Sequence, residues 1–123
     1  MNNLNTLAKT YSMKKLYYQP EDLKKFSAIN EWNETLGKKF FEYYGEVFKE
    51  GHLSAREKSL IALAVSHVVH CPYCIDAYTK DGLEKGIEKE EMMEAVHVGA
   101  AIKSGAVLVH GVQMMNRHDQ LSM

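Results

Sequence analysis

The chain has 123 residues, of which 46% are hydrophobic and 25% are charged, a size and balance that suit one soluble globular domain. Fifteen basic residues nearly cancel sixteen acidic ones, so the formal net charge of -1 gives no reason to expect nucleic acid or an anionic membrane as a partner. The N-terminus lacks the apolar block of a signal peptide, and the longest apolar run, residues 60–69, is too short to span a bilayer. These features predict a cytoplasmic protein that does not bind membranes.

The first half of the chain contains an expected arm and two expected helices. Residues 1–18 are polar with scattered apolar side chains and are expected to form an N-terminal arm. Pro20, followed by two acidic residues, predicts the first turn of a helix. Residues 34–51 carry apolar and aromatic side chains at helical spacing, and Gly51 is placed to end that helix. The aromatic side chains at 40–44 are expected to belong to the core.

The clearest helix is predicted over residues 54–69. Ser54 and Glu57 have the S-x-x-E spacing of a capping box, which marks a helix start. Apolar residues then occupy almost every side of the helix from Leu60 to Val69. A helix with this pattern is expected to be buried in the core.

Two further helices are expected after the sequence HCPYC, which spans residues 70–74. Pro72 disfavours continuation of the preceding helix and suits the first turn of a new one, which Gly86 is placed to close. A long helix rich in Ala and Gly follows from residue 89. Its small residues are expected to let another helix approach closely; they are Ala100, Ala101, Gly105 and Ala106. Since no stretch alternates with a period of two, the sequence predicts one all-α domain over residues 1–123.

Both cysteines of the chain lie in HCPYC, three residues apart. Two thiols separated by one helical turn can close a small disulfide ring, and a thiol at a helix start meets the positive end of the helix dipole, which favours its thiolate. Cys71 is expected just before the new helix and Cys74 one turn inside it. In a reducing compartment, a lone CxxC is more often catalytic or metal-binding than a structural disulfide, so a redox role is favoured over two small core residues.

A metal site is the competing interpretation of the same segment. His67, His70, Cys71 and Cys74 would share one face of an unbroken helix, and two His with two Cys is an acceptable zinc ligand set. However, ligands in a line along one helix rarely surround a tetrahedral ion, and Pro72 makes an unbroken helix unfavourable. The sequence therefore predicts no bound metal.

A thiol that attacks a peroxide needs groups that accept and donate protons. If the helix is extrapolated to Cys71, both Glu57 and His67 point toward it, so both are candidate relays. Each has a simpler explanation, because Glu57 belongs to the capping box and His67 lies on an apolar helix. Tyr78 follows Cys74 by one turn, where its hydroxyl would be placed to hydrogen-bond a sulfur or a bound peroxide, or else to pack as a core aromatic residue.

These motifs together resemble the carboxymuconolactone decarboxylase and alkyl hydroperoxidase D-like (AhpD-like) family. The resemblance covers about residues 54–110: an apolar helix, CxxC, a helix ending in Gly, and an acidic start to a long Ala- and Gly-rich helix. The wider chain, with GKKFFEYY upstream and VHGVQMMN downstream, is similar to a subgroup described as arsenosugar biosynthesis-associated peroxidase-like proteins. The resemblance implies an AhpD-like helical bundle and a homo-oligomer, commonly a trimer or hexamer. The predicted dithiol mechanism requires no cofactor.

The resemblance also implies thiol peroxidase or disulfide reductase chemistry. By similarity to the family's peroxidases, Cys74 attacks the peroxide and Cys71 resolves the sulfenic acid, whereas the dipole argument favours Cys71 as the nucleophile. AhpD carries glutamate at the position of Ser59 and histidines at those of Tyr73 and Tyr78. This chain has none of the three, so its proton relay must be built from other groups. The family's true decarboxylases lack the dithiol, which argues against decarboxylation of a lactone.

The sequence therefore predicts a dithiol peroxidase that reduces hydroperoxides through a Cys74 sulfenic acid and a Cys71–Cys74 disulfide. A thiol or disulfide reductase would supply the electrons. One alternative is a non-peroxidatic dithiol that exchanges disulfides or binds a thiophilic species such as trivalent arsenic. A second alternative is a structural or metal-binding oligomeric module.

Overall fold

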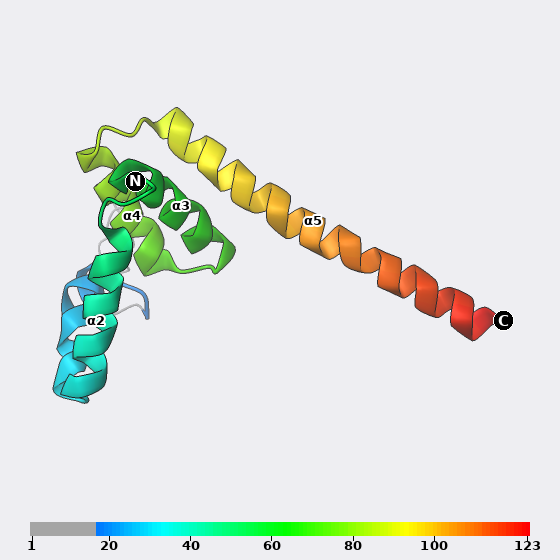
Figure 1. Cartoon of the computed structure of the whole chain (residues 1–123), viewed down its shortest axis with the longest axis horizontal. Coiled ribbons are helices and arrows are strands. Elements are labelled where there is room, and N and C mark those ends of the chain that lie inside the picture. Colours follow the sequence, from blue (N-terminus) through cyan, green and yellow to red (C-terminus); the bar gives the residue numbers. More distant parts are fainter. Residues whose placement is uncertain (1–16) are drawn as a thin grey trace, which may run out of the picture.

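In the computed structural model, which describes residues 17–123, all regular structure is helical (Figure 1). The all-α prediction is confirmed for this part of the chain. Most of the predicted N-terminal arm, residues 1–16, lies outside the described residues. The elements in chain order are the 3-10 helix η1 (Pro20–Glu31), α2 (Glu34–Phe48), α3 (Ala55–Val68), α4 (Pro72–Glu84) and α5 (Lys89–Ser122).

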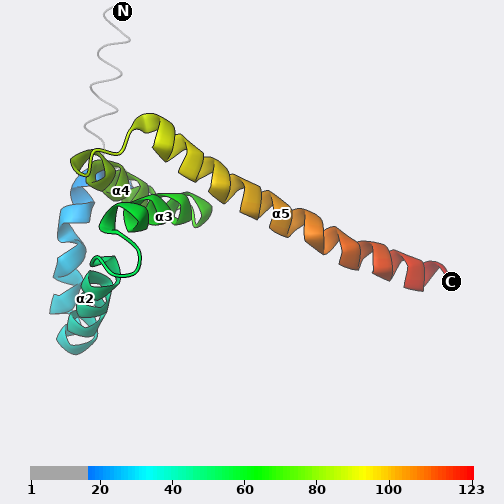
Figure 2. The same cartoon turned by 45° about the horizontal axis from the view of Figure 1, so that its top comes forward.

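The centre of the molecule is formed where α3 packs against α4 and the first part of α5 (Figure 2). Ile61 and Val65 of α3 remain 49% and 51% exposed. The expectation that α3 is buried on every side is therefore wrong within one chain, because only α4 and α5 cover it extensively. The core consists of Leu63, Ile87 and Met92, with Leu60 and Tyr78 packed against it.

The helices η1 and α2 form an antiparallel pair beside this centre (Figures 1 and 2). Aromatic rings hold the pair together: the ring centroid of Phe26 lies 5.0 Å from that of Phe41 and 6.1 Å from that of Phe40. The pair is joined to α4 by Phe48, whose ring stacks on Tyr78 with centroids 5.2 Å apart. An aromatic face of α2 is thereby turned toward the helix that carries Cys74.

The predicted starts of α3 and α4 and the end of α4 are confirmed. Ser54 and Glu57 form both hydrogen bonds of a capping box at the start of α3, and Pro72 occupies the first turn of α4. Gly86 has φ 74°, a left-handed conformation that glycine adopts without steric cost. It closes α4 by donating from its N–H to the Leu83 carbonyl at 3.1 Å.

The predicted end of α2 at Gly51 is wrong, because the helix ends at Phe48. Lys49 is already extended, with ψ 149°. The Lys58 ammonium donates hydrogen bonds to the carbonyls of Lys49 and, at 2.8 Å, of Val47. The Lys58 side chain of α3 thus donates to these two carbonyls. In a glycine turn, backbone N–H groups would bond the last carbonyls of the helix instead.

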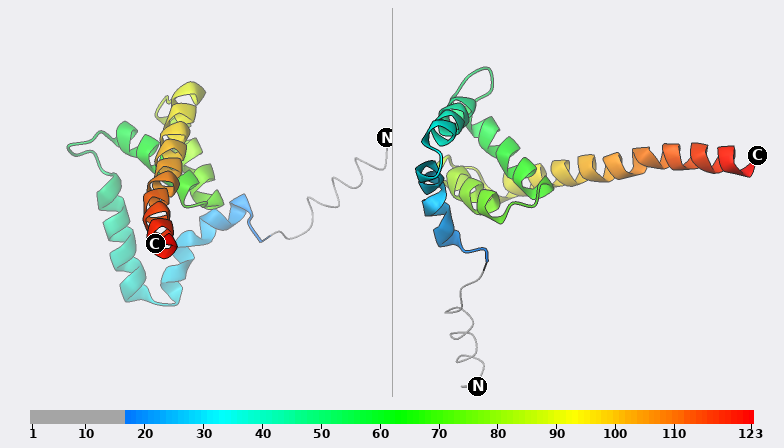
Figure 3. Two further views of the ribbon diagram at one scale, coloured as in Figure 1. Left: turned by 90° about the vertical axis from the view of Figure 1, so that its right-hand side faces the viewer. Right: turned by 90° about the horizontal axis from the view of Figure 1, so that it is seen from below.

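The long helix α5 projects far beyond the rest of the chain (Figures 1 and 3). Its close approach to α3 occurs at Gly99, where an added Cβ would lie 3.1 Å from Val68 Cγ2 and 3.3 Å from the Ala64 carbonyl oxygen. Within this chain the four small residues predicted for that role are exposed instead; they are Ala100, Ala101, Gly105 and Ala106. Of the small residues of α5, Gly99 is therefore the one at which α3 approaches the backbone closely.

By length and composition alone, α5 is also apolar enough to cross a bilayer, since an 18-residue window reaches a mean hydropathy of 1.3. A single helix that passes this test says little, because packed helices of soluble proteins pass it too. No other helix in residues 17–123 meets the same criteria.

Candidate active site

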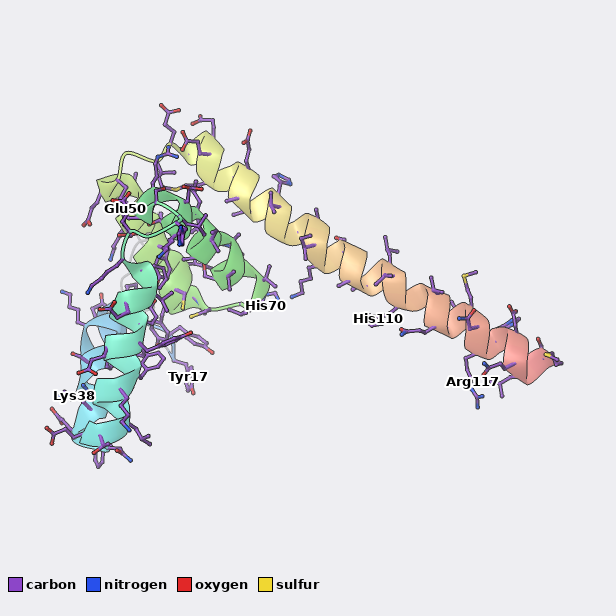
Figure 4. The ribbon with its side chains drawn as sticks, in the orientation of Figure 1. Tyr17, Lys38, Glu50, His70, His110 and Arg117 are labelled. Atoms are coloured by element: carbon purple, nitrogen blue, oxygen red, sulfur yellow. The ribbon has the colours of Figure 1, made fainter. Side chains whose placement is uncertain are left out.

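The site is set up by a tight turn between α3 and α4. The N–H of Cys71 donates to the Ser66 carbonyl at 3.0 Å, and the N–H of His70 donates to the His67 carbonyl at 3.2 Å. These two bonds define a Schellman motif, which needs a left-handed residue at the position of His70. His70 has φ 56° and lies at this turn in Figure 4. The chain therefore reverses within two residues and enters α4 directly.

This turn makes Cys71 the N-cap residue of α4. Its Sγ accepts a hydrogen bond from the N–H of Cys74 at 3.2 Å. Both cysteines are free thiols and are partly buried. The prediction that Cys71 precedes the helix and Cys74 lies one turn inside it is confirmed. An N-cap acceptor meets unpaired backbone N–H groups and the positive end of the helix dipole, an environment that suits an anionic sulfur.

The two thiols differ in their surroundings. Burial, a hydrogen bond to Cys71 and negative charge on Cys71 together raise the pKa of Cys74 to about 11, and burial is the largest of these causes. Each of these effects disfavours the charged form, so Cys74 is a neutral thiol at pH 7.

A cavity of about 590 Å³ opens beside both sulfurs. Its wall is mainly aromatic and aliphatic and is built by η1, α2 and α4, with the charged groups Asp22 and Lys25 paired at 3.5 Å on η1. An apolar molecule that entered it would meet the cysteines among hydrophobic side chains. The uncharged lining residues are Leu23, Phe26, Ile29, Phe40, Phe41, Tyr44, Cys71, Tyr73, Cys74, Ala77 and Tyr78.

A pair of tyrosines brings polar atoms into this wall. The hydroxyl of Tyr44 is hydrogen-bonded to the hydroxyl of Tyr78, and the ring of Phe48 packs against both residues. Burial raises the pKa of Tyr44, and negative charge on Cys74 and Cys71 would raise it further. Tyr44 therefore stays protonated and can donate a hydrogen bond beside the thiols.

Tyr44 is the site residue that sequence reasoning missed. The aromatic cluster at 40–44 was expected to be core, but Phe40, Phe41 and Tyr44 line the cavity instead. Helical spacing places Phe40 and Tyr44 on one face of α2. It does not show that this face meets the helix carrying the dithiol.

The two relay candidates of α3 do not reach the cavity. Glu57 is fully exposed, and hydrogen bonds from the backbone and side chain of Ser54 lower its pKa. His67 has its Nδ1 2.7 Å from the Leu63 carbonyl oxygen. Neither residue lines the space beside the sulfurs. The extrapolated helix that pointed both toward Cys71 is interrupted by the turn at His70, so their relay roles stay predictions without geometric support.

At the position where AhpD has glutamate, Ser59 is buried and donates a hydrogen bond to the Asp81 carboxylate. The same carboxylate is paired with Lys85 at 2.5 Å. Burial opposes ionisation of Asp81, but the hydrogen bonds from Lys85 and Ser59 outweigh it and lower the pKa. This carboxylate is already neutralised by its own partners, so it is poorly suited to accept a thiol proton.

In residues 17–123, no group of three or more His, Cys, Asp or Glu side chains is arranged to hold a metal ion. The two histidines of the zinc alternative are engaged elsewhere: Nδ1 of His67 faces a carbonyl, and Nε2 of His70 lies 2.6 Å from the Lys103 ammonium. The left-handed turn also removes the single helical face on which that ligand set depended.

Comparison with known proteins identifies the class to which this fold and dithiol belong. The model of the carboxymuconolactone decarboxylase family matches residues 34–116, and the chain belongs to this family. The family includes enzymes with peroxidase or decarboxylase activity. The matched region begins with α2 and therefore extends upstream of the residues that carried the sequence resemblance.

Individual proteins are also similar to the chain, among them one from Paracoccus denitrificans and one from Methanobacterium thermoautotrophicum. "Uncharacterized protein 4 in cox locus" of Paracoccus denitrificans is 39% identical over 75 residues, which are 61% of this chain and 68% of that protein. A crystal structure of a Methanobacterium thermoautotrophicum protein is 31% identical, with a TM-score of 0.67 over 70% of this chain and 97% of the other. Neither protein's name states an activity.

The raised pKa of Cys74 gives a testable pH dependence. Because only the thiolate is alkylated, the rate of Cys74 modification by iodoacetamide should increase about tenfold per pH unit and still be rising at pH 10. An ordinary thiol levels off above about pH 9. Site-resolved mass spectrometry of the reduced protein measures this rate. A Cys74 profile that is flat above pH 9 would contradict the environment described here.

Proposed function

We propose that the chain is a dithiol peroxidase that reduces organic hydroperoxides. The supporting observation is a pair of free cysteines at a helix start, with the Cys74 N–H donating to the Cys71 sulfur, that lines an aromatic cavity. An apolar cavity favours a hydroperoxide with a hydrocarbon body over hydrogen peroxide, because burial of that body supplies binding energy that hydrogen peroxide lacks.

In the proposed reaction the Cys74 thiol gives up its proton and the Cys74 thiolate attacks the distal oxygen of ROOH. The O–O bond breaks, Cys74 becomes a sulfenic acid and the alkoxide takes up the Cys74 proton to leave as ROH. Cys71 then attacks the Cys74 sulfur, a disulfide forms and hydroxide takes the second thiol proton and leaves as water. The balance is ROOH plus two thiols giving ROH, water and one disulfide.

The tyrosine pair gives this mechanism hydrogen-bond donors in place of the family's missing histidines. Tyr44, whose pKa is raised, remains protonated at neutral pH, and both tyrosines lie in the same cavity wall as the sulfurs. Their hydroxyls would stabilise the negative charge that develops on the leaving oxygen. This role needs no net proton transfer from a phenol, whose ordinary pKa near 10 makes it a poor acid–base catalyst at pH 7.

The cycle needs an external thiol or disulfide reductase to restore the dithiol, and it requires no cofactor. Antioxidant defence in the cytoplasm is the physiological role that fits these reactions. A link to arsenic metabolism, through the arsenosugar-associated subgroup, is a narrower proposal that rests on sequence similarity alone.

The dithiol chemistry can be tested by intact-mass analysis of reduced protein after a brief stoichiometric dose of peroxide and timed thiol trapping. Cumene hydroperoxide should produce an intramolecular disulfide, with loss of two hydrogens, at least about tenfold faster than hydrogen peroxide. Cys71→Ser should stop after one turnover with Cys74 as a sulfenic acid, and Cys74→Ser should not react.

A Cys71→Ser variant with full multi-turnover activity would contradict the resolving role. Wild-type thiols that oxidise no faster than a small-molecule thiol would contradict the peroxidase proposal itself. That second result would favour the alternative in which the pair binds a thiophilic species, and the affinity for arsenite would then be the measurement to make.

The tyrosine pair can be tested with conservative substitutions. Tyr44→Phe and Tyr78→Phe keep the rings of the cavity wall and remove one hydroxyl each, so each should lower the rate of Cys74 oxidation about tenfold or more. Tyr43→Phe is the matched control, since Tyr43 lies on the same helix and is 69% exposed. Equal rates in all three variants, measured by stopped-flow with cumene hydroperoxide, would exclude the pair from the reaction.

A second part of the proposal is that α5 packs against other copies of this chain, as in a trimer or hexamer. Val107, Leu108 and Val109 are consecutive and all exposed, so apolar side chains point in several directions around the helix. A helix that is apolar on all sides is normally surrounded by protein. Gly105 and Gly111 leave open space beside the backbone where another helix can approach.

Light scattering coupled to gel filtration tests this assembly. Leu108→Asp should shift the protein toward the monomer, because it places a charge in an apolar interface. Asn116→Asp adds the same charge to the polar end of α5 and should leave the mass unchanged. A monomeric wild-type protein would overturn the proposal, as would a wild-type chain that partitions into lipid vesicles through α5.

A further inference from the structure

The geometry points to Lys103 of α5 as the positioning residue that holds the turn at His70 and thereby fixes Cys71 at the start of α4. Its ammonium donates to the Val68 carbonyl at 3.1 Å and lies 2.6 Å from Nε2 of His70. One side chain thus contacts both the end of α3 and the residue of unusual backbone conformation. The inference rests on the proposed function in one respect, namely that Cys71 and Cys74 form the active site of the protein.

The turn needs such support because His70 is not a glycine. In the described chain, His70 is the one non-glycine residue with positive φ. A left-handed conformation brings Cβ close to the following carbonyl, so it persists in such a residue only where the surroundings hold it. The equivalent position after α4 is occupied by Gly86, which needs no such support.

Lys103 provides this support by two physical effects. The last carbonyls of a helix have no backbone partner, and a cation at that end also interacts favourably with the helix dipole. Val68 is the last residue of α3, so the ammonium satisfies its carbonyl from outside the helix. The imidazole of His70 accepts at Nε2 from the same ammonium, which fixes the ring relative to α5.

The turn at His70 determines the position of Cys71, the next residue in the chain. Cys71 is adjacent to His70, and its N–H completes the turn through the Ser66 carbonyl. If the turn frays, Cys71 leaves the N-cap position and its sulfur loses the Cys74 N–H. The lost N–H is a hydrogen-bond donor to the anionic sulfur that attacks iodoacetamide, so its loss slows that attack. Lys103 therefore acts on Cys71 through the backbone of residues 68–71, without lining the cavity.

The test is the rate at which iodoacetamide alkylates Cys71 in the full-length reduced protein at pH 7, resolved by mass spectrometry. Lys103→Met keeps the aliphatic stem and removes the ammonium, and should slow this reaction about fivefold, the effect of losing one helix cap. A merely loosened structure would expose the thiol and speed the reaction, so the sign separates the two roles. Lys89→Met, on the same helix, is the matched control and should react like wild type.

Two rescues make the assignment specific. Lys103→Arg retains a cation and should react within about twofold of wild type. Combining Lys103→Met with His70→Gly should restore the rate, because glycine holds the left-handed turn without support. A direct effect of the Lys103 charge on the thiol would not be rescued by glycine. Cys71 reactivity that is unchanged or faster in Lys103→Met, or unrescued in the double variant, would overturn the inference.

If Lys103→Met is too unstable for alkylation kinetics, the melting temperatures of the variants provide a second test of the role of Lys103. The substitution should lower the melting temperature in the chain with His70 by about 3–5 °C, and by much less in the chain with His70→Gly. Equal losses in both backgrounds would overturn the inference. Neither readout uses a peroxide, so absence of peroxidase activity would refute the proposed function and leave the assignment of Lys103 standing.

Discussion

The arrangement of the site depends on one backbone constraint, the left-handed residue between α3 and α4. Because His70 closes the turn, α3 ends and α4 begins without a connecting loop. Cys71 consequently lies at a helix start and Cys74 one turn inside, with a backbone N–H directed at the Cys71 sulfur. A longer connection would leave the same two residues close in sequence but without this shared environment.

The surroundings of the dithiol come from a part of the chain that is distant in sequence. The pair formed by η1 and α2 folds back on α4, and its rings close a cavity over the sulfurs. The resulting burial has two opposite effects. It leaves an apolar space beside the sulfurs, and it disfavours ionisation of Cys74, whose pKa rises to about 11.

A single chain leaves much of its apolar surface uncovered. The described core has three buried hydrophobic residues, and α5 carries exposed valine, leucine and methionine side chains along most of its length. His110 and Arg117 mark the part of α5 that extends beyond the other helices (Figure 4). A chain with so little buried surface is expected to gain stability by association. Both the exposed side of α3 and the free length of α5 fit that expectation.

The sequence by itself determined the local features. Helix starts and ends followed from short-range chemistry, such as the capping box at Ser54, Pro72 at a first turn and Gly86 at a left-handed position. The spacing of the two cysteines fixed their relation to the start of α4. These predictions succeeded because each depends on atoms within about one helical turn of the residue concerned.

Only the tertiary structure decided which residues surround the dithiol. Tyr44 lines the cavity because α2 packs on α4. Glu57 and His67 do not line it, because the turn at His70 changes the direction of the chain before Cys71. Neither effect can be read from the periodicity of a single helix. The end of α2 was also misplaced, since a lysine from α3 satisfies its last carbonyls. Contacts between elements distant in sequence therefore determined the environment of the two cysteines, and local chemistry determined their place at the start of α4.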